Sequence, residues 1–269
     1  MSKVIFEDTS ADNLIELRNI SQSYDGGQSW IIKDLDLLIE NKKGQGEFVA
    51  IMGMSGSGKS TLLRYVAGLQ QPTEGEVLLR GKPVGPDNRV GMVFQRYSSL
   101  PWMTVLENVA LALEYQGVSK KERNARAMEM IQMVGLDGHQ HKYAQYPTLS
   151  GGQLQRVAIA RSLLANPEII LMDEPFGALD IKTRLQMQDL LCEIWTKFHP
   201  TIVFITHDVN EAVYLADDIY ILKHAPAHFA AHVHVDLPLD RNRLIKRDSR
   251  FTELVHYVED KMIDVSNLG

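Results

Sequence analysis

Apolar residues fall into two patterns along the chain. Short continuous runs predict buried strands at residues 14–20, 35–40, 47–52, 76–79, 90–94, 169–172, 202–206 and 218–222. Longer stretches repeat apolar residues every three or four positions, and predict helices at residues 59–67, 104–116, 119–134, 152–165, 181–198 and 249–262. Strands that alternate with helices in this way are typical of an α/β fold, in which helices enclose a sheet.

The helical pattern is concentrated in one part of the chain. Between about residues 96 and 165 no strand is expected; Thr104 is a candidate N-cap, and Ser119 with Glu122 has the capping-box spacing. We therefore expect a helical subdomain (about 96–165) inserted into a core formed by about 14–95 and 166–225. The strands at 14–20 and 35–40 are expected in an amino-terminal sheet, and residues 226–269 in a short carboxy-terminal appendage.

Charge and composition exclude several classes of function. The chain has 34 acidic and 28 basic side chains, a net charge of −6, which argues against a nucleic-acid partner and against loose attachment to anionic lipid. Residues 1–13 lack the pattern of a signal peptide, and no apolar run approaches the ~20 residues that cross a bilayer. The one cysteine, Cys192, is expected as a buried reduced thiol, which fits an intracellular compartment. Any link to a membrane should therefore run through a protein partner.

A glycine-rich loop lies between a predicted strand and a predicted helix. It matches G-x-x-x-x-G-K-[ST], and its glycines allow backbone N–H groups to point at phosphates. Lys59 is expected to reach the β- and γ-phosphates, and the Ser60 hydroxyl to ligate Mg²⁺. The alternative is a glycine turn that matches by chance, and even a true match predicts only a nucleoside triphosphate. The predicted ATP-binding residues of this phosphate loop (residues 53–60) and the next position are Gly53, Met54, Ser55, Gly56, Ser57, Gly58, Lys59, Ser60 and Thr61.

Two further features fit a triphosphate. Asp173 ends a predicted strand and suits coordination of Mg²⁺, while the adjacent Glu174 can polarise an attacking water as a general base; the alternative is a simple turn before Pro175. Gly151 and Gly152 precede a strong helix and would expose backbone N–H groups as a second anion site. The alternative there is an N-cap with a flexible entry.

These motifs occur together and in order, and together they resemble the ATP-binding cassette (ABC) ATPase family. The resemblance covers roughly residues 14–225. It implies a P-loop NTPase (RecA-like) core with an amino-terminal antiparallel β subdomain and an inserted helical subdomain. It also implies a head-to-tail homodimer in which the signature segment (residues 149–153) of one subunit contacts the γ-phosphate held by Lys59 of the other. The residues that carry the resemblance, besides the phosphate loop, are Leu149, Ser150, Gly151, Gly152, Gln153, Asp173, Glu174, Ala178, Leu179, Asp180 and His207.

The resemblance also implies roles for single residues. Tyr24 matches the aromatic residue that stacks on adenine, and Asp180 matches the residue that links the two sites of the dimer. Gln95 matches a glutamine that contacts Mg²⁺ and water, and His207 matches the switch histidine at the γ-phosphate. The alternatives are ordinary structural roles for a tyrosine, a loop glutamine and a histidine. The implied catalytic residues are Glu174, His207 and Gln95, and the implied Mg²⁺ ligands are Ser60, Gln95 and Asp173.

A finer resemblance concerns transport. Residues 95–105, 173–180 and 211–213 are similar to the nitrate/sulfonate/taurine/bicarbonate branch of importers. Members of that branch work with an integral-membrane permease and an extracytoplasmic substrate-binding protein, which implies a peripheral protein on the cytoplasmic face of the inner membrane. The turn at 41–45 is longer than the common pattern, and Tyr97, Ser98 and Ser99 before Leu100 also depart from it, so the substrate class stays open.

These motifs favour one class of function over three others. The leading hypothesis is the energising subunit of an ABC importer for a small anion. The alternatives are a soluble ABC ATPase and an exporter or lipid-trafficking cassette; a phosphoryl-transferring kinase would have no use for the signature segment. Four histidines after the core raise the possibility of a metal site, but Pro226 and the alternation at 232–236 predict a hairpin rather than one helical face. These histidines are His224, His228, His232 and His234.

Overall fold

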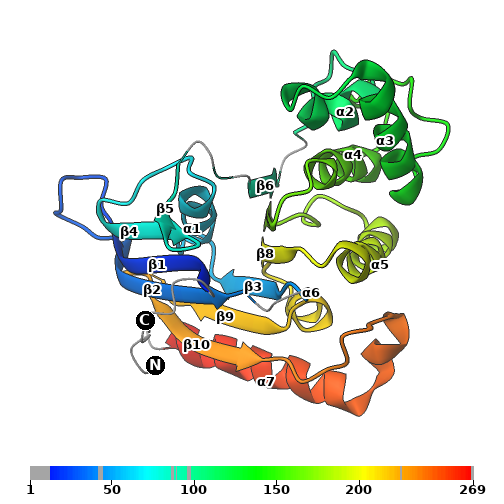
Figure 1. The fold of residues 1–269 in the computed structure, drawn as a ribbon. Coiled ribbons are helices and arrows are strands. Elements are labelled where there is room, and N and C mark those ends of the chain that lie inside the picture. Colours follow the sequence, from blue (N-terminus) through cyan, green and yellow to red (C-terminus); the bar gives the residue numbers. More distant parts are fainter. Residues whose placement is uncertain are drawn as a thin grey trace.

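Two sheets and a group of helices make up the molecule (Figure 1). The computed structural model describes residues 13–41, 45–85, 88, 90–95, 98–224 and 226–267. Within them a four-stranded sheet has the order β2-β1-β4-β5, and a six-stranded sheet has the order β10-β9-β3-β8-β7-β6. The predicted α/β fold, with an amino-terminal antiparallel sheet and a helical insertion, is confirmed.

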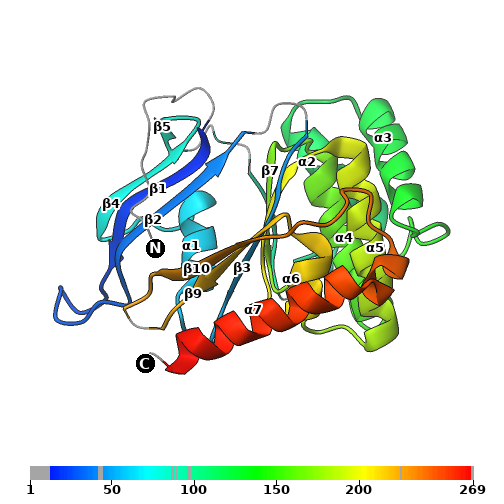
Figure 2. The ribbon, with the colours of Figure 1, turned by 90° about the horizontal axis from the view of Figure 1, so that it is seen from below.

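The smaller sheet is formed by β1 (Asn13–Gln22), β2 (Ile32–Glu40), β4 (Glu74–Leu79) and β5 (Lys82–Pro83). All its pairings are antiparallel. In β2 the buried Leu35, Leu37 and Ile39 alternate with more exposed residues, as expected for a strand with one face on a core. Helix α1 (Lys59–Val66) lies between this sheet and the larger one (Figure 2).

The larger sheet positions the candidate site. It contains β3 (Phe48–Gly53), β6 (Val90–Val93), β7 (Ile169–Asp173), β8 (Thr201–Ile205), β9 (Asp218–Leu222) and β10 (Phe229–His234). Strands β9, β3, β8, β7 and β6 are parallel and lie side by side in that order. Strand β10 pairs antiparallel with β9. Because parallel strands share an edge for their carboxyl ends, the loops after β3, β6, β7 and β8 meet there.

Both faces of the larger sheet are covered, which explains its continuous apolar runs. In β3, Val49 and Ile51 pack into the core that contains α1 and the smaller sheet. Phe48, Ala50 and Met52 pack into the opposite core. That second core also contains α5 (Ile181–Phe198), α6 (Val209–Leu215) and α7 (Ser249–Asn267).

The helical subdomain consists of α2 (Val105–Tyr115), α3 (Lys120–Met133) and α4 (Gly151–Leu164). Thr104 and Ser119 are N-caps as predicted, but the two reciprocal bonds of a capping box form at Thr104 and not at Ser119. Thr104 forms a capping box with Glu107, and the Ser119 hydroxyl accepts a hydrogen bond from the backbone N–H of Glu122. These local bonds satisfy donors that a helix leaves unpaired at its start.

The carboxy-terminal residues pack against the central sheet. β10 extends the central sheet, and α7 packs against β9, β10 and α6. The short 3₁₀ helix η1 (Arg243–Arg247) precedes α7, which runs five residues beyond the predicted end at 262. The pairing of β9 with β10 confirms the predicted hairpin. Residues 42–44 of the predicted long turn, and Arg96 and Tyr97, lie outside the described residues.

The structure also bears on the predicted histidine cluster, on membrane spans and on Cys192. His232 Nε2 and His234 Nδ1 both lie beside Asp218 Oδ1, at 2.7 and 3.2 Å. Among the described residues there is no group of three or more side chains arranged to hold a metal ion, and no helix that could span a bilayer. Cys192 is half-buried on α5, and burial raises the pKa of its thiol to about 11. The thiol is therefore protonated at neutral pH.

Candidate active site

The phosphate loop connects β3 to α1 through a backbone that only glycine adopts without strain. Gly53 has φ +153°, and a Cβ built there would lie 2.6 Å from the carbonyl oxygen of Leu222. Gly58, the N-cap of α1, has φ +89°. The two glycines therefore allow the loop to close tightly above the sheet and to present the first N–H groups of α1, which form an anion site.

Lys59 places a positive charge inside this loop. Its ammonium donates hydrogen bonds to the carbonyl oxygens of Gly53, at 2.9 Å, and Met54, at 2.7 Å. Burial lowers the pKa of Lys59, although Asp173 and Glu174 counteract the shift. A cation held in a partly desolvated loop interacts more strongly with phosphate than one in open water.

The end of β7 supplies a carboxylate to the same place. Ser60 Oγ donates a hydrogen bond to Asp173 Oδ1 at 3.0 Å. Burial raises the pKa of Asp173, so a cation beside it would favour the ionised form. A hydroxyl oxygen and a carboxylate oxygen are hard donors of the type that Mg²⁺ takes. The residues present at this edge of the sheet therefore fit a magnesium ion.

Two predicted residues, Gln95 and His207, approach the carboxylate of a third, Glu174. Gln95 Nε2, after β6, donates a hydrogen bond to Glu174 Oε2 at 3.0 Å. His207 Nδ1, after β8, lies 3.6 Å from the same oxygen. Glu174 itself has φ +44°, a conformation that costs a non-glycine residue about 1–2 kcal/mol, and its N–H donates to the carbonyl oxygen of Ile205. Backbone strain of this kind tends to gather at functional sites.

The signature segment lies elsewhere, at the start of α4. Ser150 Oγ accepts a hydrogen bond from the N–H of Gln153, whose side chain accepts one from the N–H of Ser150. Among the described residues no hydrogen bond or ion pair joins this segment to the phosphate loop, and both ribbon views place α4 apart from α1. The signature segment is therefore separate from the phosphate loop within one chain.

Gly152 has a second reason to be glycine, which the sequence did not reveal. A Cβ built on it would lie 2.3 Å from Cγ2 of Thr183, in the first turn of α5. Thr183 donates a hydrogen bond from Oγ1 to Asp180, the N-cap residue of α5. The signature segment thus packs directly on the residue pair that begins α5.

Two further predicted ATP-binding residues, Tyr24 and Thr61, make no side-chain hydrogen bond to the loop among the described residues. Tyr24 follows β1 with 64% of its surface exposed, and its hydroxyl accepts a hydrogen bond from Gln70 Nε2. An exposed ring of this kind can stack on a nucleobase. Thr61 lies half-buried in the first turn of α1.

Sequence reasoning also missed Asn108, which organises the loop before α2. This fully buried amide on α2 donates hydrogen bonds to the carbonyl oxygens of Leu100, Met103 and Thr104, and accepts one from the N–H of Leu100. The same loop presents Trp102 with 69% of its surface exposed. An asparagine among the apolar residues of a helix was the available signal, because buried amides require partners.

Comparisons with known proteins agree with this geometry. Residues 39–177 match the family model described as ABC transporter. The taurine import ATP-binding protein TauB of Pseudomonas fluorescens (strain Pf0-1) is 42% identical, over 93% of this chain and 94% of that protein. The nitrate import ATP-binding protein NrtD of Synechocystis sp. (strain ATCC 27184 / PCC 6803 / Kazusa) is 44% identical, over 88% and 90%. The dimeric post-hydrolysis structure of the ATP-binding cassette MJ0796 bound to ADP and Pi is similar with a TM-score of 0.72 at 35% identity, over 84% of this chain and all of that one.

Proposed function

Because the chain belongs to the ABC transporter family, we propose that its hydrolysis of ATP energises the uptake of a small anion, of the nitrate, sulfonate, taurine or bicarbonate type, through a membrane permease. The protein is an ATPase of the ABC importer type. The observation that carries the hydrolytic part of the proposal is the approach of Gln95 and His207 to Glu174, beside the phosphate loop. The import ATP-binding relatives match nearly the whole chain, which favours an importer over a soluble or exporting cassette.

The geometry divides the work of hydrolysis among the residues of the loop edge. The N–H groups of the phosphate loop and the Lys59 ammonium hold the β- and γ-phosphates. Glu174 accepts a proton from the attacking water, and Gln95 and His207 hold its carboxylate in one orientation. Ser60, Asp173 and Gln95 would hold Mg²⁺, which neutralises phosphate charge when bound.

We propose that a second copy of the chain completes each site. Ser150 and Gly152 of the partner copy would add backbone donors near the γ-phosphate and exclude water from it. Support comes from the separation of the two anion sites within one chain and from the dimeric form of the similar MJ0796 cassette. Asp180 would then lie close to the point where the two copies meet, because Gly152 packs against Thr183 of the same helix start.

We place the permease contact on the segment 96–105 and the surface beside it. Trp102 is exposed there, and exposed aromatic residues are common anchors of interfaces. A hollow of about 520 Å³ lies between β6, α2 and α4, and Met92, Leu111 and Tyr115 contribute to its wall. The complex would include an extracytoplasmic substrate-binding protein and no nucleic acid, with this chain at the cytoplasmic face of the inner membrane.

The test is reconstitution of the chain with its permease and binding protein in liposomes. We expect taurine, nitrate, a sulfonate or bicarbonate to stimulate ATP hydrolysis, and the same anion to accumulate only with ATP on the side of this subunit. Trp102→Ala should lose the stimulation and keep nucleotide affinity, whereas Tyr257→Ala, an exposed aromatic control on α7, should keep both. A fully assembled complex whose hydrolysis is indifferent to all four anions would contradict the proposed substrate class.

A further inference from the structure

A buried polar chain runs from the loop that carries His207 to the carboxy-terminal part of the protein. Thr206 Oγ1, next to His207, donates a hydrogen bond to Glu211 Oε2 at 2.6 Å. Gln188 Nε2, on α5, donates to Glu211 Oε1 at 3.3 Å. Lys246 Nζ, in η1, donates to Gln188 Oε1 at 2.9 Å. Glu211 lies at the centre of this chain, on α6.

Glu211 controls both neighbours of His207. Its side chain fixes Thr206, and its backbone N–H donates to Asp208 Oδ1, at 3.2 Å. The N–H of Asp208 donates in turn to Thr206 Oγ1, at 3.1 Å. The His207 side chain is 67% exposed, so contacts to its two neighbours, rather than packing of the ring, set its direction toward Glu174.

Burial makes this arrangement costly to disturb. Thr206, Gln188 and Glu211 are each exposed by no more than 4%. Burial raises the pKa of Glu211, although the Thr206 hydroxyl and Arg184 act in the opposite direction. Arg184 lies 3.7 Å from Glu211 Oε1 and 3.6 Å from Asp208 Oδ2. A buried polar group that loses its partner costs about 1–3 kcal/mol, so the network favours one position of the loop.

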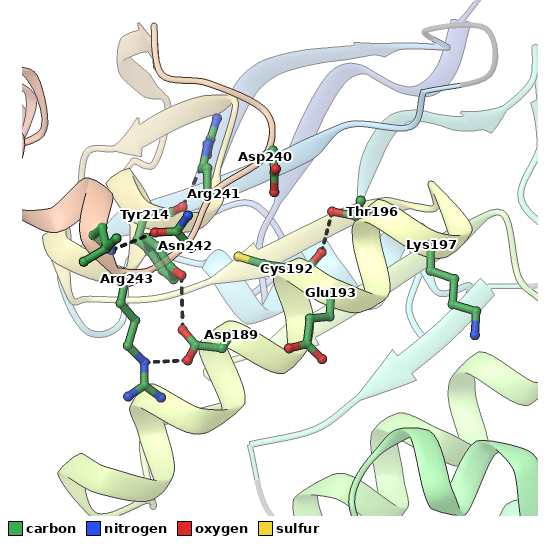
Figure 3. A pocket seen from close by; sticks show the side chains of 11 residues that line it. Asp189, Cys192, Glu193, Thr196, Lys197, Tyr214, Asp240, Arg241, Asn242 and Arg243 are labelled. Atoms are coloured by element: carbon green, nitrogen blue, oxygen red, sulfur yellow. Dashed lines mark hydrogen bonds and ion pairs between the residues drawn. The ribbon is translucent and has the colours of Figure 1, made fainter.

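The segment that carries Lys246 is itself anchored to the core of the protein. Arg241, nearly fully buried, donates from Nη1 to the carbonyl oxygen of Ala216 at 2.7 Å and from Nη2 to Asp217 at 2.9 Å. Figure 3 shows Arg243 and Tyr214 both pointing to Asp189, with distances of 2.5 and 3.1 Å, beside a hollow of about 630 Å³. Lys246 lies 4.1 Å above the Tyr214 ring. Lys246 is therefore held both by the Tyr214 ring and by Gln188.

We propose that Glu211 is a positioning residue for hydrolysis, which holds the loop 206–208 so that His207 faces Glu174, and that Lys246 orients Glu211 through Gln188. The proposal rests on the proposed role of His207. Glu211 makes no contact with the phosphate loop among the described residues, so its effect on the reaction would pass through His207. Lys246 would give the segment after the central sheet an influence on the rate of hydrolysis.

The first experiment separates turnover from binding. Thr206→Val removes the hydroxyl and keeps the shape, whereas Thr206→Ser keeps the hydroxyl. We expect Thr206→Val and Glu211→Ala each to lower kcat about tenfold with KM for ATP changed less than about threefold, and Thr206→Ser to stay within about twofold of the parent in both. Equal kcat in Thr206→Val and Thr206→Ser, or a loss confined to KM, would overturn the proposal.

The second experiment asks whether Glu211 acts through His207. In a His207→Ala background, single-turnover hydrolysis should be unchanged, within about twofold, when Glu211→Ala is added. A purely structural role would instead multiply the two losses, and that result would overturn the proposal. If His207→Ala alone keeps near-normal turnover, the proposed function of His207 fails. If instead His207→Ala is slow and Glu211→Ala turns over normally, the inference about Glu211 fails and the proposed function of His207 stands.

The third experiment tests the input from Lys246. Lys246→Met keeps most of the side-chain volume and removes the donor, and should lower kcat about two- to threefold without changing KM. Lys197→Met is the matched control, because the Lys197 ammonium lies over the Phe198 ring as that of Lys246 lies over the Tyr214 ring, and Lys197 lies outside the polar chain. Equal kcat in the two variants would overturn the role of Lys246.

Discussion

The phosphate-loop edge and the start of α4 are both built to face an anion, but only one contains groups that can carry out a reaction. At the loop edge Ser60 contacts Asp173, and both Gln95 and His207 approach Glu174. At the start of α4, within the part of the chain that the structure describes, the side chains of Ser150 and Gln153 bond to each other's backbone and to His139 of the helical subdomain. The difference supports the proposed shared site, to which one chain would contribute two unlike halves.

The two halves should also contribute to different steps. A charged hydrogen bond such as one from Lys59 contributes about 1.5–3 kcal/mol, whereas a helix N-terminus contributes about 0.3–1 kcal/mol to a nearby anion in the ground state. Ground-state binding of ATP should therefore depend on the loop edge. The start of α4 should act mainly when charge develops on the γ-phosphate, where preorganised donors have their largest effect.

The largest effect is expected at the carboxylate of the loop edge. Glu174→Gln keeps the shape and removes the base, so turnover should fall by about 10² to 10⁴ while ATP affinity is retained. Single-turnover hydrolysis and nucleotide titration measure the two quantities. Glu193→Gln, an exposed position on α5, is the control and should behave like the parent. Near-normal turnover of Glu174→Gln would remove Glu174 from the role of base.

The next effect concerns the start of α4. Ser150→Arg should lower turnover at least about 10²-fold and change ATP affinity less than about twofold, because it blocks the donors without touching the loop. Ser119→Arg is a matched control, because both serines are exposed N-caps whose hydroxyl accepts a hydrogen bond from the backbone N–H three residues later. Both variants therefore lose a helix cap, which costs about 1 kcal/mol of stability. Equal turnover of the two variants would mean that the signature segment is only a cap.

Mixing variants sharpens the same comparison. Lys59→Ala and Ser150→Arg should each be nearly inactive alone. A mixed dimer contains one site with both lesions and one site with neither, so mixing should restore part of the activity. The amount of activity recovered in a titration of one variant into the other measures this, and no recovery despite proven mixed dimers would contradict independent sites.

A smaller effect is expected at Tyr24. Loss of one stacking contact should weaken ATP binding by about 1–2 kcal/mol, which is roughly 5- to 30-fold in Kd. Tyr24→Ala should show this loss by calorimetry with turnover at saturating ATP little changed. Tyr257→Ala, a half-exposed tyrosine on α7, controls for removal of a surface ring. Unchanged affinity in Tyr24→Ala would mean that adenine is held elsewhere.

The smallest effect is on stability. Burial raises the pKa of Asp173 in the folded protein above its value in the unfolded chain. As pH rises, the unfolded chain therefore loses this proton first. The free energy of unfolding falls between the unfolded and the folded pKa of Asp173. Without nucleotide, Asp173→Asn should therefore unfold at a higher urea concentration than the parent at about pH 7. This gain should shrink as pH falls toward the unfolded value of about 4. A variant less stable than the parent at pH 7 would contradict the assignment.

Local patterns in the sequence predicted most elements of the fold. The core strands are continuous apolar runs, and Thr104 and Ser119 cap helices where predicted, because both signals depend on neighbours in the chain. The short elements β5, α6 and η1 were missed, because segments of two to seven residues carry little periodicity. The hairpin that contains β10 was predicted, but its place in the central sheet depends on pairing with β9.

The motif residues of the site could be predicted, but the residues that hold them could not. Gln95, Glu174 and His207 follow strands whose ends meet, and the structure brings them together. Thr183 contacts Gly152, and Glu211 contacts Gln188, between elements that are distant in sequence, and no periodicity encodes such a contact. Their roles follow only from the packing of α4 and of α6 on α5.

The comparison rests on the claim that neither half works without a second copy. The most direct measurement is the specific activity of the parent protein against its concentration, at saturating ATP, in detergent and without permease, with sedimentation of the same samples. We predict that specific activity falls in proportion to concentration once the protein is monomeric, because two chains must meet to assemble a site. Specific activity that stays flat down to concentrations where the protein sediments as a monomer would contradict the shared site.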